Sequence, residues 1–253
     1  MFLRSAVIAI LAMGVHVVSA QGIDSVFTEI YHVQPDSIPG RPPLVTYRIF
    51  VDLAPGYEMQ MVYGDEINQL KITTTGDIFN DKENGAKYAG QINADKLNDF
   101  PLALDSWFTI NAASDRHLGV PRAWDTDGSV LECPPYPGFG MAQVKGDKPL
   151  CTSDGLLAAD SVPDVVDFRM QPGYLGTIRG SVLHTMDGAW AVLGGTKGVT
   201  EHNVCLIAQI TTTGTLSYRL NVQLRTPDRK VVRYVSTEAR GTDEVLYPGL
   251  LRD

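Results

Sequence analysis

Hydrophobic and polar residues alternate with a period of two along much of the chain. In residues 216–225, Leu, Tyr and Val occupy every second position, and polar side chains fill the positions between them. Residues 47–53 alternate in a similar way. This period is typical of a strand that buries one face and leaves the other in solvent. We therefore expect both segments to be half-buried strands.

Further apolar runs predict additional strands. They lie at residues 57–63, 70–75, 106–110, 176–184, 189–193, 204–212 and 231–236. The run at 204–210 is apolar on both faces, which favours a central strand. Pairs such as Pro55-Gly56 and Asp187-Gly188 separate the runs and are typical of turns.

Segments with the period of an amphipathic helix are scarce. The best candidates for helical turns are residues 94–99 and 155–159, and Pro163 would end the second. Many short strands with frequent turns predict an all-β fold, an antiparallel β-sandwich or jelly-roll-like domain with little helix. We expect residues 21–253 to form a single large β-sandwich domain. Because residues 119–172 are rich in Pro, Gly and Asp, two β subdomains joined through about 119–172 are the alternative.

The first twenty residues have the pattern of a secretory signal peptide. Arg4 supplies a positive charge, residues 6–18 form an apolar run, and Val18-Ser19-Ala20 places small residues before a cleavage point. The apolar run is shorter than the ~20 residues that a membrane-spanning helix needs. We expect cleavage after Ala20, which exports residues 21–253 to the extracellular space, free or associated with a cell surface.

The net charge of the chain limits the kinds of molecule that it is expected to bind. The full chain carries 21 Lys and Arg against 29 Asp and Glu, a net charge of −8, and loss of Arg4 makes it −9. An acidic balance argues against nucleic-acid binding, which needs a basic face for phosphate. No later run is long enough to span a membrane. The expected partner is an extracellular protein or a glycan.

Because we expect export, we interpret the three cysteines as those of a protein in an oxidising compartment. Cys133 and Cys151 bracket a loop rich in Pro and Gly, and a disulfide between them would stabilise the fold by roughly 3 kcal/mol. Cys205 lies in an apolar run and is expected to be a buried free thiol. A catalytic role for Cys205 has no support from its neighbours in sequence.

Motifs for common catalytic and cofactor sites are missing from the sequence, so we expect no catalytic residues and no cofactor. The expected exported chain, residues 21–253, has four scattered histidines, with no two at the spacing of metal ligands: His32, His117, His184 and His202. Asp125 and Asp127 resemble the start of a calcium loop, but Gly128 comes too early for that pattern. An Asp-Gly turn is the favoured interpretation, with calcium binding as the alternative.

Aromatic side chains are the remaining candidates for ligand binding. Trp124 lies in a predicted loop, where it can stack on a sugar ring. Tyr136 and Phe139, on the loop between the paired cysteines, are expected to join it. Trp107 and Trp190 lie inside predicted strands and are expected in the core.

Several segments together resemble an uncharacterised secreted β-sandwich module that recurs in exported and cell-surface proteins of Bacteroidetes-like and other environmental bacteria. They read TYRIFVDL at 46–53, VYGD at 62–65, LKITTT at 70–75, LDSWFTI at 104–110, DGAWAV at 187–192 and LIAQITTTG at 206–214. The resemblance covers about residues 44–225. It implies an extracellular β module in a surface or matrix context, and it implies no catalytic residues.

Three functional hypotheses follow. The leading one is an exported, non-enzymatic β-sandwich protein that acts in extracellular adhesion, in a matrix or in a surface assembly. The second is a carbohydrate-binding module with Trp124 as its platform. The third is a secreted hydrolase with two catalytic carboxylates among Asp105, Asp115, Asp125 and Asp127.

Overall fold

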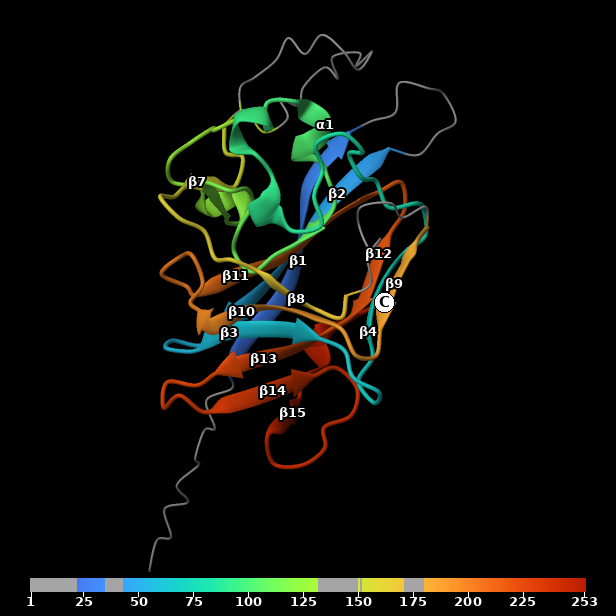
Figure 1. The fold of residues 1–253 in the computed structure, drawn as a ribbon, viewed down its shortest axis with the longest axis vertical. Helices are drawn as coiled ribbons and strands as arrows, with labels where there is room; N and C mark the ends of the chain where they lie inside the picture. The colour runs from blue at the N-terminus through green and yellow to red at the C-terminus, as the bar shows by residue number, and fades with distance from the viewer. Residues whose placement is uncertain (1–21, 35–42, 132–149, 151, 171–179) are drawn as a thin grey trace, which may run out of the picture.

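The computed structural model describes residues 22–34, 43–131, 150, 152–170 and 180–253. These residues form an all-β fold with several sheets, which confirms the expected fold class and is consistent with a β-sandwich (Figure 1). Neighbouring strands are antiparallel except for the parallel pair β14 and β15. Within the described residues the one α-helix, α1 (Phe100–Ala103), has four residues.

Three sheets make up the body of the molecule. The first has the order β1 (Ile23–Gln34), β2 (Leu44–Leu53), β11 (Val204–Thr212), β5 (Trp107–Phe108). The second has the order β15 (Glu244–Leu246), β14 (Val231–Val235), β13 (Asn221–Arg225), β3 (Glu58–Tyr63), β10 (Ala189–Thr196), β8 (Val166–Phe168). The third has the order β16 (Leu251–Arg252), β12 (Leu216–Arg219), β4 (Leu70–Thr74), β9 (Val182–Thr185).

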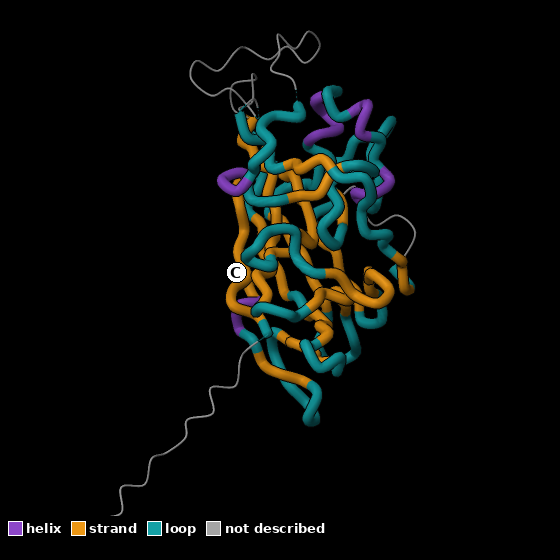
Figure 2. Tube along the Cα trace, turned by 90° about the vertical axis from the view of Figure 1, so that its left-hand side faces the viewer, coloured by secondary structure: helices purple, strands orange, loops and turns teal. Residues whose placement is uncertain are grey.

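The remaining elements are small. A two-stranded sheet pairs β6 (His117–Gly119) with β7 (Leu156–Ala158). The 3-10 turns are η1 (Ala89–Gln91), η2 (Ala94–Lys96), η3 (Arg122–Trp124) and η4 (Pro248–Leu250). Most of the helical turns gather at one end of the molecule (Figure 2).

The main hydrophobic core lies between the first sheet and the other two large sheets. Every second residue of β2, from Tyr47 to Leu53, belongs to it, together with Val62 of the second sheet and Ile72 of the third. The central strand β11 is buried at all its positions, as its unbroken apolar pattern predicts. Burial of these alternating side chains is the main force that holds the layers together.

The second and third sheets meet at a corner. Among the segments that join these two sheets are β3–β4, β9–β10, β12–β13 and β15–β16, and the strands of the third sheet run steeply across those of the second (Figure 1). Asn221 is fully buried at this corner. Its amide donates to the carbonyl oxygens of Tyr63 (3.1 Å) and Asn68 (2.6 Å), and its oxygen accepts the Ser236 N–H (3.3 Å).

Irregular chain covers the opposite face of the first sheet. We call it the cap: residues 79–131 and 152–162, apart from β5, which joins the first sheet (Figure 1). A second hydrophobic cluster fills the space between them, with Phe50 and Leu206 from the sheet and Ile92, Leu102 and Leu156 from the cap. The first sheet is therefore covered on both faces.

Most expected strands are confirmed. Residues 47–53, 57–63, 70–75, 189–193, 204–212 and 231–236 correspond to β2, β3, β4, β10, β11 and β14. Two are shorter than expected: only β5 forms within 106–110, and β9 begins at Val182, while 176–179 lie outside the described residues. Trp107 and Trp190 are buried in the core, as predicted.

Other expectations are wrong. The segment 216–225 is not one strand, because the chain changes sheets at Leu220. Residues 155–159 form β7 rather than a helical turn, because Gly155 has a left-handed φ of 65° and the next residues pair with β6. In contrast, the helical turn expected at 94–99 is confirmed and forms η2. Strands β1, β6, β8, β15 and β16 were not predicted.

No helix in the described part of the chain has the length and apolar character needed to cross a membrane.

Candidate functional site

Polar residues of the first sheet lie beneath the cap. In the strand register, Arg48 of β2 is flanked by Glu29 of β1 and Gln209 of β11. The alternating pattern assigns Arg48 to a solvated face, but only 2% of this residue is exposed. The expectation of a solvated face for residues 47–53 is therefore wrong, because the cap takes the place of solvent.

A β-bulge brings Tyr31 to the same place. Ile30 and His32 pair with consecutive residues of β2, so Tyr31 is an extra residue in β1. Bulges re-aim side chains, and the Tyr31 ring is buried beside Arg48. Its hydroxyl donates to the backbone carbonyl of Asp154 at 2.7 Å, and burial raises the pKa of Tyr31 to about 12. The phenol therefore stays neutral and acts as a donor.

The Arg48 guanidinium has neutral partners. Its Nε donates to Gln209 Oε1 at 2.9 Å, and its Nη1 donates to the carbonyl oxygen of Gly155 at 3.0 Å. Its Cζ lies 3.5 Å from the centre of the Tyr31 ring, which is a cation–π contact. Among the ion pairs between described residues, none includes Arg48.

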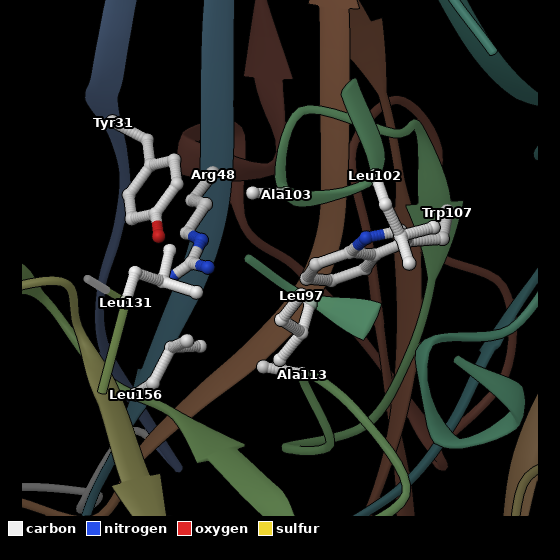
Figure 3. A pocket seen from close by; sticks show the side chains of 9 residues that line it. All are labelled: Tyr31, Arg48, Leu97, Leu102, Ala103, Trp107, Ala113, Leu131 and Leu156. Atoms are coloured by element: carbon white, nitrogen blue, oxygen red, sulfur yellow. The ribbon is translucent and has the colours of Figure 1, made fainter. Parts of the chain in front are cut away.

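A small cavity adjoins the guanidinium. Arg48 and Tyr31 lie on one side of it, and Trp107, Leu97 and Leu102 lie on the other (Figure 3). The other lining residues are Ala103, Ala113, Leu131 and Leu156. Its volume is about 10 Å³, roughly the room for one water molecule and far below that of a drug-sized pocket. This cavity can hold one small species, but it cannot hold a sugar or a peptide.

Two acidic side chains lie near the Arg48 cavity without contacting its guanidinium. Asp154 is fully buried, and its carboxylate accepts backbone N–H groups from Val130 (2.5 Å), Leu131 (2.6 Å) and Leu156 (3.1 Å). Burial raises the pKa of Asp154 to about 6 despite these bonds. Asp154 therefore serves first to hold the cap backbone together.

Glu29 is the second acid. Its Oε1 accepts the Arg122 N–H at 2.9 Å, whereas its buried Oε2 has no partner among the described residues. Burial raises the pKa of Glu29, although Arg122 and Arg48 act to lower it. Glu29 therefore interacts electrostatically with Arg48, but the two side chains form no direct ion pair.

Trp124 lies in η3 and is half-buried rather than freely exposed. Its ring centre is 4.9 Å from that of His202 and 6.5 Å from that of Phe27. Phe27 in turn stacks on Phe50 at 5.2 Å. The structure therefore places Trp124 at the end of an aromatic row. Tyr136 and Phe139 lie outside the described residues, as does the proposed Cys133–Cys151 disulfide.

Asp125 and Asp127 bind backbone groups. Asp125 accepts the N–H groups of Asp127 (3.2 Å) and Gly128 (3.1 Å), which is an Asx-type turn, and also that of Gly155 (2.9 Å). Asp127 accepts the N–H of Ala158 at 2.9 Å. Both carboxylates thus tie η3 to β7. The described residues contain no group of three or more metal-binding side chains.

The other candidate groups are also engaged in the fold. Asp105 is fully buried and accepts the N–H groups of Asp81 (2.8 Å) and Ala86 (2.9 Å), and Asp115 accepts that of Ala94 (2.9 Å). None of the four candidate aspartates lines the Arg48 cavity. Cys205 is a buried free thiol, as predicted.

One serine and one histidine lie within hydrogen-bond distance. Ser114 Oγ and His117 Nδ1 are 2.7 Å apart, across the turn that leads into β6. Because Ser114 is fully buried and three residues from its partner, the pair stabilises a turn and offers no accessible nucleophile.

Sequence reasoning missed Arg48, Tyr31 and Asp154. Gln209, within the apolar run of β11, was a usable signal, because a polar residue in a central strand needs a buried partner. Its amide also donates to the carbonyl oxygens of Ala103 (3.0 Å) and Asp105 (2.8 Å).

Comparison of the chain with protein-family models, with curated proteins and with solved structures finds no match.

Proposed function

We propose that this chain is an exported, non-enzymatic β-sandwich protein that acts in extracellular adhesion, in a matrix or in a surface assembly, through the outer edge of β1. The observation that carries the proposal is the length of this edge. Strand β1 has 12 residues, and in the described part of the chain only β2 pairs with it. An unpaired edge offers N–H and C=O groups to a strand of another molecule.

The side chains of β1 favour this use. Ile30 is 59% exposed and Val33 is 47% exposed. They pair with Tyr47 and Val45 of β2, which lie two positions apart, so the bulge places Ile30 and Val33 on the same face. The strand contains no Lys, Arg or Pro, the residues that commonly protect an edge from pairing.

Self-association and surface binding of residues 21–253 test the proposal. We expect sedimentation velocity to detect oligomers, or labelled protein to bind intact cells of the producing organism. The double substitution Ile30→Lys/Val33→Lys should weaken either interaction at least tenfold. Leu193→Lys is the matched control, because Leu193 is 74% exposed on β10, away from this edge. A monomer that binds no cells, or an interaction that the double variant leaves unchanged, contradicts the proposal.

Export itself is tested separately. The proposal expects the secreted protein to begin at Gln21, which N-terminal sequencing of the culture supernatant measures. Retention of residues 1–20 in the secreted protein would contradict it.

Glycan binding at Trp124 is a second candidate, favoured by the pairing of this ring with His202 at 4.9 Å. Asp52 lies nearby, since its charge interacts with that of His202, and burial raises its pKa. A ring beside polar groups is a common surface for sugars. Trp124→Ala should abolish binding on a glycan array, whereas Phe168→Ala, at another exposed aromatic, should not. Absence of binding by the wild-type protein removes this candidate.

A further inference from the structure

Within the described residues, Arg48 is a buried cation without a directly contacting counter-ion. Its bonded partners are the neutral oxygens of Gln209 and Gly155, and its stacking partner is the neutral ring of Tyr31. A guanidinium remains charged at any ordinary pH. An unpaired buried charge is strongly destabilising, so a nearby negative charge would be bound favourably.

The cavity beside Arg48 is rich in unused donors. Two of the five guanidinium N–H groups are bonded within the described residues, which leaves three without an acceptor. The indole N–H of Trp107, on the opposite wall, donates no hydrogen bond within the described residues. Arg48 Cζ is 5.9 Å from the Trp107 ring centre, so the two side chains lie on facing walls of the cavity.

The other walls restrict what can enter. They are apolar side chains, among them Leu97, Leu131 and Leu156, and they offer no acceptor and no second cation (Figure 3). A polyatomic divalent anion such as sulfate would exceed the cavity and leave oxygens unsatisfied. Asp154 and Glu29 do not occupy the free donors, because their oxygens accept backbone N–H groups elsewhere or remain unpartnered.

We propose that this cavity is a binding site for one small monovalent anion of the halide class, held by Arg48 and Trp107. Chloride is the abundant extracellular member of that class. The bound anion neutralises the guanidinium, accepts the free N–H groups and fills the space between the first sheet and the cap. This site is independent of the β1 edge and of the proposed function.

Halide-dependent stability is the solution test. The full exported chain is unfolded with urea in sodium bromide, in sodium chloride and in sodium gluconate at equal ionic strength. Halide bound only by the folded state should raise the folded-to-unfolded ratio by about 100-fold at a concentration 100 times its Kd. Equal stability in halide and gluconate overturns the proposal, because gluconate is too large for the cavity.

Variants at Arg48 and Arg122 test whether halide acts at the cavity. The Arg48→Met variant should lose the dependence of stability on halide. If the Met variant does not fold, the Arg48→Lys variant is measured in its place. Arg122→Met is the matched control: Arg122 donates to Ser153 O at 2.7 Å and does not line the cavity, so its variant should keep the dependence. Halide dependence that survives loss of the Arg48 guanidinium contradicts the assignment.

Crystals soaked in bromide give the direct readout. We expect an anomalous peak between Arg48 Nη2 and the Trp107 ring. Density for a water molecule without anomalous signal overturns the proposal, as does bromide bound only at the protein surface.

Discussion

The buried carboxyl of Asp105 should make the stability of this protein depend on pH. Asp105 is fully buried just before β5, and its two oxygens accept the N–H groups of Asp81 and Ala86. Burial raises its pKa from 3.8 to about 7, which outweighs the backbone hydrogen bonds that favour the carboxylate. The folded protein therefore keeps a proton on Asp105 at pH values where the unfolded chain releases it.

The sign and size of this pH dependence follow from proton linkage. Between about pH 4 and pH 7, unfolding releases the Asp105 proton, so the free energy of unfolding falls as pH rises. The slope is about 1.4 kcal/mol per pH unit, and over roughly three units the loss reaches about 4 kcal/mol. The contribution is complete below pH 4 and lost above pH 7.

Asp105→Asn isolates this effect. The amide lacks one of the two acceptors, so at pH 4 we expect the variant to be about 1–3 kcal/mol less stable than wild type. Because the variant has no proton to lose, it should gain about 4 kcal/mol relative to wild type by pH 8. The two stability curves should therefore cross.

Urea unfolding at pH 4, 5, 6, 7 and 8 measures both curves. Asp77→Asn is the control, because Asp77 is an exposed aspartate in the same part of the chain. The Asp77→Asn variant keeps Asp105, so its stability should fall with rising pH as that of the wild type does. Parallel curves for wild type and Asp105→Asn would refute the reasoning, since they would mean that Asp105 titrates alike in the folded and unfolded states.

Three further predictions concern the buried core. Asn221→Ala removes the amide that donates to two buried carbonyl oxygens and accepts the Ser236 N–H, and it should cost about 2–4 kcal/mol in urea unfolding; a cost below 0.5 kcal/mol contradicts this. Cys205 is buried, and burial raises the pKa of its thiol, so it should react slowly with alkylating reagents in the folded protein. Mass spectrometry at pH 8 should find the Cys205 peptide alkylated at least 100-fold faster in denaturant than in native buffer, and equal rates would contradict this prediction. Gly64→Ala places a Cβ 2.3 Å from the Thr185 carbonyl oxygen and should lower the free energy of unfolding by about 3 kcal/mol. Gly90→Ala is the control: its Cβ has its nearest neighbour at 3.8 Å, so it should lower the free energy of unfolding by less than about 1 kcal/mol. Similar losses for the two variants would contradict the prediction.

The alternating pattern predicts burial better than it predicts connectivity. Tyr218, Leu220 and Val222 alternate without a break and all enter the main core, yet they belong to two sheets. The pattern records which side chains face the core, and a change of sheet between two layers around one core leaves it intact. The positions of β12 and β13 were therefore predictable, but the end of β12 was not.

The candidate site was less predictable for a related reason. Arg48 occupies the polar phase of an alternating strand, and nothing near it in sequence says whether solvent or protein covers that face. The cover comes from residues about 50 to 110 positions later, such as Leu102 and Leu156. Their own segments have weak periodicity, because irregular backbone is held by side chains such as Asp105 and Asp154 rather than by strand pairing.

The corner at Asn221 has a consequence for how the protein opens. Because β3–β4, β9–β10, β12–β13 and β15–β16 each connect the second sheet to the third, neither sheet can separate without bending several covalent segments. The two sheets therefore form one cooperative unit, and their central amides should share a common free energy of hydrogen exchange. The cap is joined to the first sheet by backbone hydrogen bonds as well, such as those from the Phe79 N–H to Thr211 O (2.7 Å) and from the Asn111 N–H to Leu206 O (2.8 Å), and by the second hydrophobic cluster. Partial unfolding should therefore not release the second sheet while the third sheet stays folded.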